Sequence, residues 1–309
     1  MTTALYLAAL TVGFGIMVVA SRFAVGSATE LVAGTRVPPF VIGMTVLAIG
    51  TDLPEIANSI VSSWTDHGDV NVGDALGSAA TQTTLVLGLL PLIAGSMLVT
   101  ARGIASVGWL AVAGLAVIAF VASDDWFSRT DAIVLIAMWV IGSWWTFRRV
   151  RRPHQLSLPE ETSPRGRLIV RTLLSLGVVA AAAMLSLWAL VELAEEWNAP
   201  EFLVSFFLAS IGTSLPELVF DITAVRRGEV ELAIGDIFGS TFIDSTLAVA
   251  IGPLFFPVAV TSTDVVPAAI AALVAVAAVT LVITRIREHD WRTGSLLIVM
   301  YAAFFLVLL

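Results

Sequence analysis

Residues 48–55 read AIGTDLPE and residues 210–217 read SIGTSLPE, and each octapeptide lies in the middle of a long apolar run. Proline has no backbone N–H and clashes with the carbonyl four residues earlier, so Pro54 and Pro216 should each interrupt a helix and free one carbonyl. A glutamate follows each proline, although the surrounding residues are mainly apolar. Two interrupted apolar helices, each with an acid near its centre, therefore decide the fold.

The two octapeptides belong to a longer internal repeat. Residues 40–91 align with residues 202–253 without a gap, and 15 of the 52 aligned positions are identical. Most of these identities are Gly, Thr, Pro, Glu, Asp and Ser, whereas chance agreement between apolar helices would supply Leu, Val and Ala. The repeat is therefore a duplicated site, and duplicated units with interrupted helices are typical of secondary transporters.

The composition indicates a protein embedded in a membrane. Of the 309 residues, 58% are hydrophobic and only 13% are charged, and the mean hydropathy is +0.95; soluble domains normally have about 25% charged residues. At about 20 residues per crossing, this length gives roughly ten helices. We predict spans at residues 3–21, 39–64, 71–99, 103–122, 131–147, 168–192, 201–225, 232–257, 265–284 and 293–309. The first run lacks the basic segment of a cleavable signal peptide, so we expect it to be a span.

These spans predict an all-α integral membrane protein with ten transmembrane helices arranged as two inverted five-helix repeats. Five spans separate equivalent helices, so the two copies must cross the membrane in opposite directions. The first half is residues 1–148 with its repeat at 40–91, and the second half is residues 168–309 with its repeat at 202–253. Residues 149–167 form the linker between them.

The arginines predict the orientation in the cell membrane. All 16 basic residues are arginine, and 15 of them fall in alternate connections between the predicted spans. Cytoplasmic loops collect positive charge. We therefore expect both termini outside the cell and the linker in the cytoplasm.

Several classes of function are excluded by composition. The chain has no cysteine, which excludes disulfides and thiolate metal sites, and its three histidines all lie in polar connections. A lysine-free chain with a net charge of −8 is a poor partner for nucleic acid. We expect membrane lipid and inorganic cations as partners, with no cofactor, and nothing in the sequence implies a protein partner.

The repeated glutamates point to a cation. Glu55 and Glu217 lie at membrane depth, where a charge costs several kcal/mol unless it is paired, and no arginine falls inside a span. Carboxylates, freed carbonyls and nearby hydroxyls form an all-oxygen ligand set, which suits hard cations such as Ca²⁺ and Na⁺. The hydroxyls near the two glutamates belong to Thr51, Thr213, Ser78 and Ser240.

The third and eighth spans carry a second set of polar residues, beginning with Gly-Asp-x-x-Gly-Ser. Residues four apart share one face of a helix. On one face lie Asp74, Ser78 and Gln82, and on the equivalent face lie Asp236, Ser240 and Asp244. We expect the glycines of this motif (Gly73, Gly77, Gly235 and Gly239) to serve close helix packing. Asp221 has Ser59 as its counterpart, and the sequence leaves its role open between structure and ion binding.

At these residues the chain resembles the cation/calcium antiporter superfamily and, within it, the sodium/calcium exchangers. Their two α-repeats are usually written Gly-Thr-Ser-Leu-Pro-Glu and Gly-Asn-x-x-Gly-Ser-Asn. The resemblance implies that Glu55 and Glu217 bridge bound ions, and that the first and sixth spans slide past a core of eight helices. The further ion ligands that it implies are Thr51, Thr213, Ser214, Ser78 and Ser240 through side chains, Ala48 and Ser210 through carbonyls, and Gln82 and Asp244 at the amide or acid position.

The chain departs from the family pattern by gaining acids. Asp52 replaces a serine, Asp74 and Asp236 replace asparagines, and Gln82 replaces an asparagine. Extra carboxylates could bind another cation or carry protons, so they leave the coupling ion and the stoichiometry open. Asp244 resembles the acid of potassium-dependent exchangers, which adds K⁺ as a co-ion to consider.

Several functions compete on the sequence alone. The leading hypothesis is a secondary-active antiporter, not an enzyme, that exchanges Na⁺ for Ca²⁺ by alternating access with ions bound at the membrane midplane. The alternative is an H⁺-coupled or K⁺-dependent Ca²⁺/cation exchanger. An intramembrane hydrolase could use paired carboxylates, but the inverted duplication favours transport. A passive channel would not require that duplication.

Overall fold

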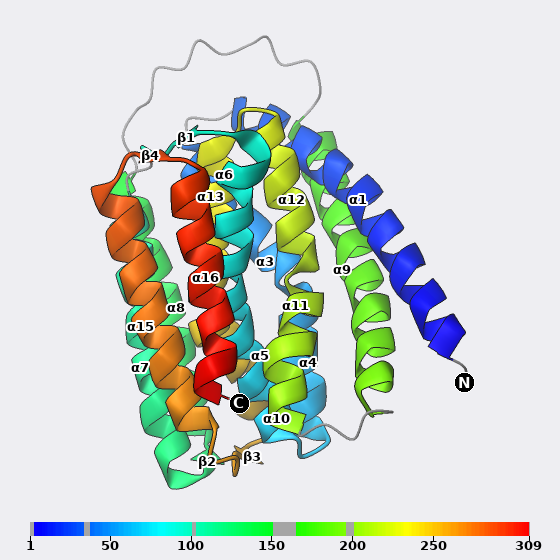
Figure 1. The fold of residues 1–309 in the computed structure, drawn as a ribbon, viewed down its shortest axis with the longest axis vertical. Coiled ribbons are helices and arrows are strands. Elements are labelled where there is room, and N and C mark those ends of the chain that lie inside the picture. Colours follow the sequence, from blue (N-terminus) through cyan, green and yellow to red (C-terminus); the bar gives the residue numbers. More distant parts are fainter. Residues whose placement is uncertain (1–2, 34–37, 101–102, 151–164, 196–200, 309) are drawn as a thin grey trace.

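A helix forms at each apolar run that predicted a span (Figure 1). The computed structural model describes residues 3–33, 38–100, 103–150, 165–195 and 201–308. The first half contains α1 (Thr3–Ala33), α2 (Pro39–Ile42), η1 (Gly43–Leu47), α3 (Ala48–Thr51), α4 (Leu53–Trp64), α5 (Gly68–Ala80), η2 (Thr81–Val86), α6 (Leu87–Ala94), β1 (Met97–Leu98), α7 (Ile104–Val121), η3 (Ala122–Asp124), β2 (Trp126–Phe127) and α8 (Arg129–Val150). The second half contains α9 (Arg165–Glu195), α10 (Glu201–Val204), η4 (Ser205–Ala209), α11 (Ser210–Thr213), α12 (Leu215–Arg226), α13 (Val230–Ile243), η5 (Asp244–Ala248), α14 (Val249–Phe255), β3 (Val258–Ala259), α15 (Val265–Arg285), β4 (Glu288–His289) and α16 (Trp291–Leu308).

Six helices among the described residues are long and apolar enough to cross a membrane, and the bent pair α2–α3 and α4 makes a seventh. The protein is therefore a mainly helical, multi-pass membrane protein. The helices α1, α9 and α16 fall on the three remaining predicted spans but are not among those seven. The ten-span arrangement thus stays a prediction, and most of the predicted linker at residues 149–167 lies outside the described residues.

Some predicted boundaries were wrong. The third span was expected to reach residue 99, but its helix ends at Ala94 because Gly95 has φ +84°, in the left-handed region that stops a helix. Beyond it, β1 pairs with β4, and β2 pairs with β3 at the other end of the bundle (Figure 1). The outer helices α1 and α9 are each 31 residues long and continue past the predicted ends at residues 21 and 192.

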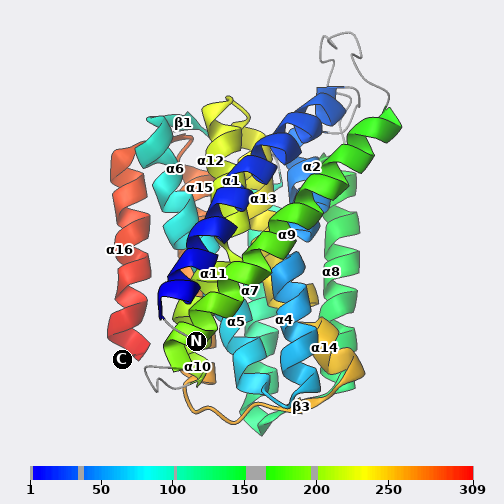
Figure 2. The ribbon, with the colours of Figure 1, turned by 90° about the vertical axis from the view of Figure 1, so that its right-hand side faces the viewer.

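Equivalent helices of the two halves run in opposite directions. Chain direction in Figures 1 and 2 shows that α1 rises from the N-terminus while α9 descends beside it. In the same views α5 leads upward into α6, whereas α13 leads downward into α14. This is the arrangement expected of an inverted duplication.

The helices that carry the prolines are interrupted as predicted. The axis turns by 44° between α3 and α4, where Asp52 separates the two segments. Ser214 separates α11 from α12 at the equivalent place, but residues 202–226 still form one continuous span. The sequence did not predict the π-helical turns that precede each break, η1 and η4, or those that follow α5 and α13, η2 and η5. Such turns disturb the normal hydrogen-bond ladder and often lie at functional sites.

Glycines let the two halves interlock. A Cβ at Gly77 on α5 would overlap the carbonyl oxygen of Phe206 in η4, and a Cβ at Gly239 on α13 would lie 2.5 Å from the Cα of Met44 in η1. Positions 44 and 206 are equivalent in the repeat, so each half packs its third helix on the interrupted helix of the other. The structure confirms the close-packing role predicted for these glycines.

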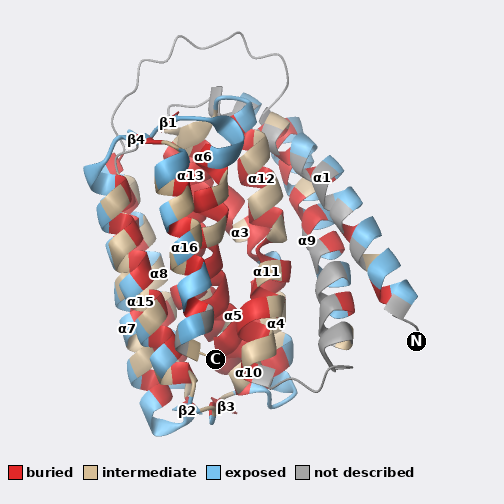
Figure 3. Ribbon diagram, in the orientation of Figure 1, coloured by how far each residue is buried: buried red, intermediate tan, exposed pale blue. Residues whose placement is uncertain are grey.

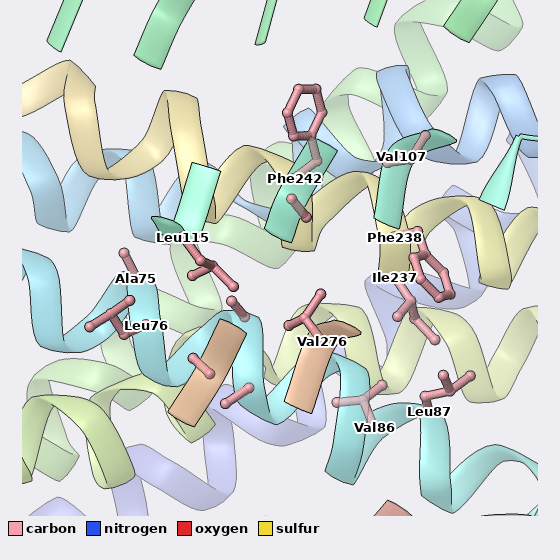
Figure 4. Close-up of a cluster of buried hydrophobic side chains, with 14 of the residues drawn as sticks. Ala75, Leu76, Val86, Leu87, Val107, Leu115, Ile237, Phe238, Phe242 and Val276 are labelled. Atoms are coloured by element: carbon pink, nitrogen blue, oxygen red, sulfur yellow. The ribbon is translucent and has the colours of Figure 1, made fainter. Parts of the chain in front are cut away.

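Apolar side chains hold this crossing in place. The spans of residues 230–255 (α13 to α14) and 68–94 (α5 to α6) are the most enclosed, with 83% and 78% of the residues in their most apolar stretch buried. Figure 3 shows the buried residues on these central helices and exposed faces on the outer ones. Figure 4 shows part of the cluster around them, formed by Ala75, Leu76, Val86, Leu87, Val107, Leu115, Ile237, Phe238, Phe242 and Val276. A core this tightly packed transmits small changes in helix spacing.

We predict that Gly77→Ala destabilises the protein by about 1–3 kcal/mol, because the added methyl group must push α5 away from η4. Thermal unfolding in detergent measures the effect. Gly177→Ala on α9 is the matched control, since a Cβ there meets nothing within 4 Å. Equal melting temperatures for the two variants would contradict the packing assigned to Gly77.

Candidate cation site

The structure buries all the predicted site residues inside the bundle. They lie on α3–α4 and α5–η2 of the first half and on α11–α12 and α13–η5 of the second half. All fourteen are buried: Ala48, Thr51, Asp52, Glu55, Asp74, Ser78, Gln82, Ser210, Thr213, Ser214, Glu217, Asp236, Ser240 and Asp244. The crosswise packing of the glycines is what places the two sets against each other.

Three carboxylates form the centre of the site. Asp52, Glu55 and Asp244 each offer an oxygen, and these three atoms lie within 4.8 Å of one another. Glu217 and the hydroxyl of Ser240 approach Asp52 from the second half. The three carboxylates come from both repeats, so neither half can form this group alone.

Hydroxyl groups connect the two repeats around these acids. The Thr213 hydroxyl donates to Oδ1 of Asp74 at 3.1 Å and lies 3.2 Å from the Ser78 hydroxyl. At the equivalent place in the second half, Asp236 lies beside Thr51. Thr241 donates to Oε1 of Gln82 at 3.4 Å. The aspartates on α5 and α13 thus each lie beside the threonine of the opposite repeat.

The two threonine hydroxyls donate to backbone carbonyls one helical turn earlier, and the carbonyls of Ala48 and Ser210 also accept the backbone N–H groups of Asp52 and Ser214 at 3.0 Å. The Thr51 hydroxyl lies 3.1 Å from the carbonyl oxygen of Leu47 and 3.3 Å from that of Ala48. The Thr213 hydroxyl lies 3.1 Å from the carbonyl oxygen of Ala209 and 3.3 Å from that of Ser210. The same hydroxyl-to-carbonyl hydrogen bonds therefore occur at equivalent positions in the two halves.

The buried acids have no protein cation to neutralise them. Within the described residues, both carboxylate oxygens lack a hydrogen-bond partner in Asp52, Glu55, Glu217, Asp221, Asp236 and Asp244. Other acids are the strongest charged neighbours of five of them, namely Asp52, Glu55, Glu217, Asp221 and Asp244. Burying like charges together is strongly unfavourable unless a cation or proton joins them. The arrangement can bind hard cations through oxygen ligands.

Sequence reasoning missed Asn58. Its side-chain amide donates to Oδ2 of Asp74 at 2.6 Å, so Asp74 is the one acid of the cluster whose two oxygens both have partners among the described residues. The signal was present in the sequence, because position 58 is three residues after Glu55 and lies on the same helix face. Its counterpart in the repeat is Phe220, so the alignment of identical positions passed over it.

A second acidic feature lies at one end of the bundle. Glu229, Glu231 and Glu288 line a cavity of about 630 Å³ near β1 and β4, at the same end of the bundle as Arg226 and Arg227. Burial raises the pKa of Glu229, and the nearby Arg227 opposes that shift. The cavity adds negative charge at one end of the bundle.

Known proteins match the chain over nearly its full length. A family model described as "Sodium/calcium exchanger protein" matches residues 5–148 and 167–309. Inner membrane protein YrbG of Escherichia coli (strain K12) is 31% identical over 265 residues, which cover 81% of this chain and 80% of that protein. Sodium/calcium exchanger MaX1 of Methanosarcina acetivorans is 24% identical over 293 residues, covering 81% and 83%. Putative antiporter CaxA of Alkalimonas amylolytica is 28% identical over 250 residues, covering 77% and 76%.

The fold also matches a solved structure. The sodium-calcium exchanger NCX_Mj soaked with 100 mM Na⁺ and 10 mM Sr²⁺ superimposes with a TM-score of 0.81 at 24% sequence identity, and all of each chain is covered. At this identity the match establishes the fold.

We predict that Ca²⁺ stabilises the purified protein against heat, because a bound cation neutralises the unpartnered carboxylates only in the folded state. At a free concentration one hundred times the dissociation constant the gain is about 2.7 kcal/mol. Melting temperatures with Ca²⁺ and with a chelator measure it. Glu55→Gln with Glu217→Gln should abolish the shift, and Glu288→Gln, at an exposed glutamate, should retain it. A shift that persists in the double variant would contradict the site.

Proposed function

Because the chain belongs to the sodium/calcium exchanger protein family, we propose that it exchanges Na⁺ for Ca²⁺ across the cell membrane by alternating access. Cation/Ca²⁺ antiport, and not an enzymatic reaction, is supported at the level of the family. The observation that carries the proposal is the buried group of carboxylates drawn from both repeats. An exchanger needs such a group to stabilise desolvated cations inside the membrane.

The proposed ion-binding residues are those predicted from the sequence. Glu55 and Glu217 bridge the bound ions, and the other ligands surround them through hydroxyl, amide, carboxylate and carbonyl oxygens. These other ligands are Thr51, Thr213, Ser78, Ser240, Ser214, Gln82, Asp52, Asp74, Asp236 and Asp244, with the carbonyl groups of Ala48 and Ser210. Their common burial and their all-oxygen chemistry support this set.

The proposed topology has ten spans in two inverted five-helix halves, residues 1–148 and 168–309, with both termini outside and the linker at 149–167 in the cytoplasm. The opposite directions of α1 and α9, and of α5 and α13, support the inversion (Figures 1 and 2). The distribution of arginine supports the orientation.

In the proposed transport cycle α1 and α9 move together past the other helices. The Tyr6 hydroxyl on α1 donates to Oε2 of Glu192 on α9 at 2.7 Å, and the Tyr6 ring meets the ring of Trp188 edge to face. These contacts join the two outer helices. Against the core, Leu176 of α9 packs directly on Gly50, whose lack of a side chain leaves a smooth surface beside the cation site.

A proton-coupled exchanger is the second candidate. It is favoured by the three acids that exceed the family pattern, Asp52, Asp74 and Asp236, because carboxylates that gain and lose protons can replace Na⁺ as the counter-ion. Asp52 belongs to the central three-carboxylate group. In this case Ca²⁺ uptake follows a pH gradient without Na⁺, and Asp52→Ser removes that uptake.

We predict that Glu55→Gln and Glu217→Gln each reduce Ca²⁺ flux to background while the protein still folds, because each removes one carboxylate from a desolvated site. The measurement is ⁴⁵Ca²⁺ uptake into proteoliposomes under separate Na⁺, H⁺ and K⁺ gradients. Glu288→Gln serves as the control and should transport normally. Flux driven by Na⁺ alone supports the first candidate, and flux driven by a pH gradient alone supports the second. Normal exchange in Glu55→Gln would refute the site.

A disulfide between α9 and the core should stop transport if α9 moves. The Cβ of a residue at position 50 would lie 3.2 Å from the Cβ of Leu176, near the roughly 3.5–4.5 Å of a disulfide. The natural chain has no cysteine, so Gly50→Cys with Leu176→Cys introduces a single pair. We predict that oxidation abolishes ⁴⁵Ca²⁺ flux and that reduction restores it, while each single variant is insensitive to oxidant. Unchanged flux in the oxidised, cross-linked protein would show that α9 does not need to slide.

A further inference from the structure

The two halves differ around two equivalent aspartates, Asp74 on α5 and Asp236 on α13. In the first half, Asp74 accepts hydrogen bonds from Asn58 at 2.6 Å and from Thr213 at 3.1 Å. In the second half, Phe220 occupies the position equivalent to Asn58, and the hydroxyl of Thr51 lies beside Asp236 without a well-aligned hydrogen bond to either carboxylate oxygen. The amide that satisfies Asp74 is therefore missing where the duplication would place it.

An additional acid stands beside the unsatisfied aspartate. Asp221 follows Phe220 on α12, and its strongest charged neighbours are Asp236 and Glu217. The residue is completely buried, and both of its carboxylate oxygens lack a partner within the described part of the chain. Its counterpart Ser59 is neutral and accepts the backbone N–H of Gly252 at 3.1 Å. The second half thus has two adjacent carboxylates where the first half has one carboxylate held by an amide.

This pair is separate from the central three-carboxylate group. That group consists of Asp52, Glu55 and Asp244, and includes neither Asp221 nor Asp236. Asp221 lies one helical turn after Glu217, toward the C-terminal end of α12 at Arg226. The Thr51 hydroxyl lies beside Asp236 and can donate to the Leu47 carbonyl, which leaves its own lone pairs free to bind a cation.

We propose that Asp221 joins Asp236 and the hydroxyl of Thr51, two of the ligands proposed above, to form a further cation site next to the central group. Two carboxylates carry two negative charges, and one divalent cation neutralises both with a hard oxygen ligand set. The identity of that cation as Ca²⁺ rests on the proposed function. The site lies between the central acids and the arginine-bearing end of α12, so an ion moving toward that end would bind there after leaving Glu217.

Equilibrium dialysis of the purified protein against ⁴⁵Ca²⁺ tests this site by counting bound ions at saturation. Asp221→Ser installs the residue of the first half, and Asp221→Asn keeps the shape of the side chain. Both variants should bind one Ca²⁺ fewer than the natural protein, and Asp264→Ser, at an acid at the start of α15, should bind the full number. Size-exclusion chromatography of each variant confirms that it is folded.

Three outcomes would overturn the site. If both Asp221 variants bind as many Ca²⁺ ions as the natural protein, the pair is not a Ca²⁺ site, and the proposed exchange function is unaffected. If the variants lose a ²²Na⁺ ion with an unchanged Ca²⁺ count, the site is monovalent and the divalent assignment is wrong. If the natural protein binds no Ca²⁺, both the further site and the proposed function fail.

Discussion

The close contact between the third helix of each half and the interrupted helix of the other half is the constraint on which the rest of the structure depends. Gly77 meets the backbone of Phe206, and Gly239 meets that of Met44. Side chains at these two positions would separate the helices by ångströms. Because there are none, acids from both repeats reach the same buried volume, and the three-carboxylate group of Asp52, Glu55 and Asp244 can form.

Bringing these acids together places several negative charges in a buried, apolar environment. Six buried acids have carboxylate oxygens without a partner among the described residues. Hydrophobic packing cannot offset several unpaired charges, since each costs several kcal/mol in an apolar environment. A protein that keeps such a group must bind cations or protons, as the proposed antiport requires.

The interrupted helices and much of the candidate site could be predicted from the sequence, because the motifs that define them are local or repeated. The gapless repeat, the two prolines and the acids at helical spacing predicted the interrupted helices and most of the site acids and hydroxyls. The family resemblance added Ala48, Ser210 and Ser214, and all fourteen residues are buried. The paired strands β1–β4 and β2–β3 were not predicted, since each strand has only two residues and depends on tertiary contacts. The π-helical turns were not predicted, because a local change in backbone hydrogen bonding has no clear sequence pattern. The Asn58–Asp74 hydrogen bond was also missed, because Asn58 is not repeated in the second half.

The position of the bound cation tests the central claim most directly. A crystal structure in Ca²⁺ or Sr²⁺, with the ion located by its anomalous scattering, shows which oxygens surround it. The crosswise assembly predicts an ion that contacts Glu55 of the first repeat and Glu217 of the second repeat at the same time. An ion bound by residues of one half only, or no ion among these acids at saturating concentration, would contradict the account.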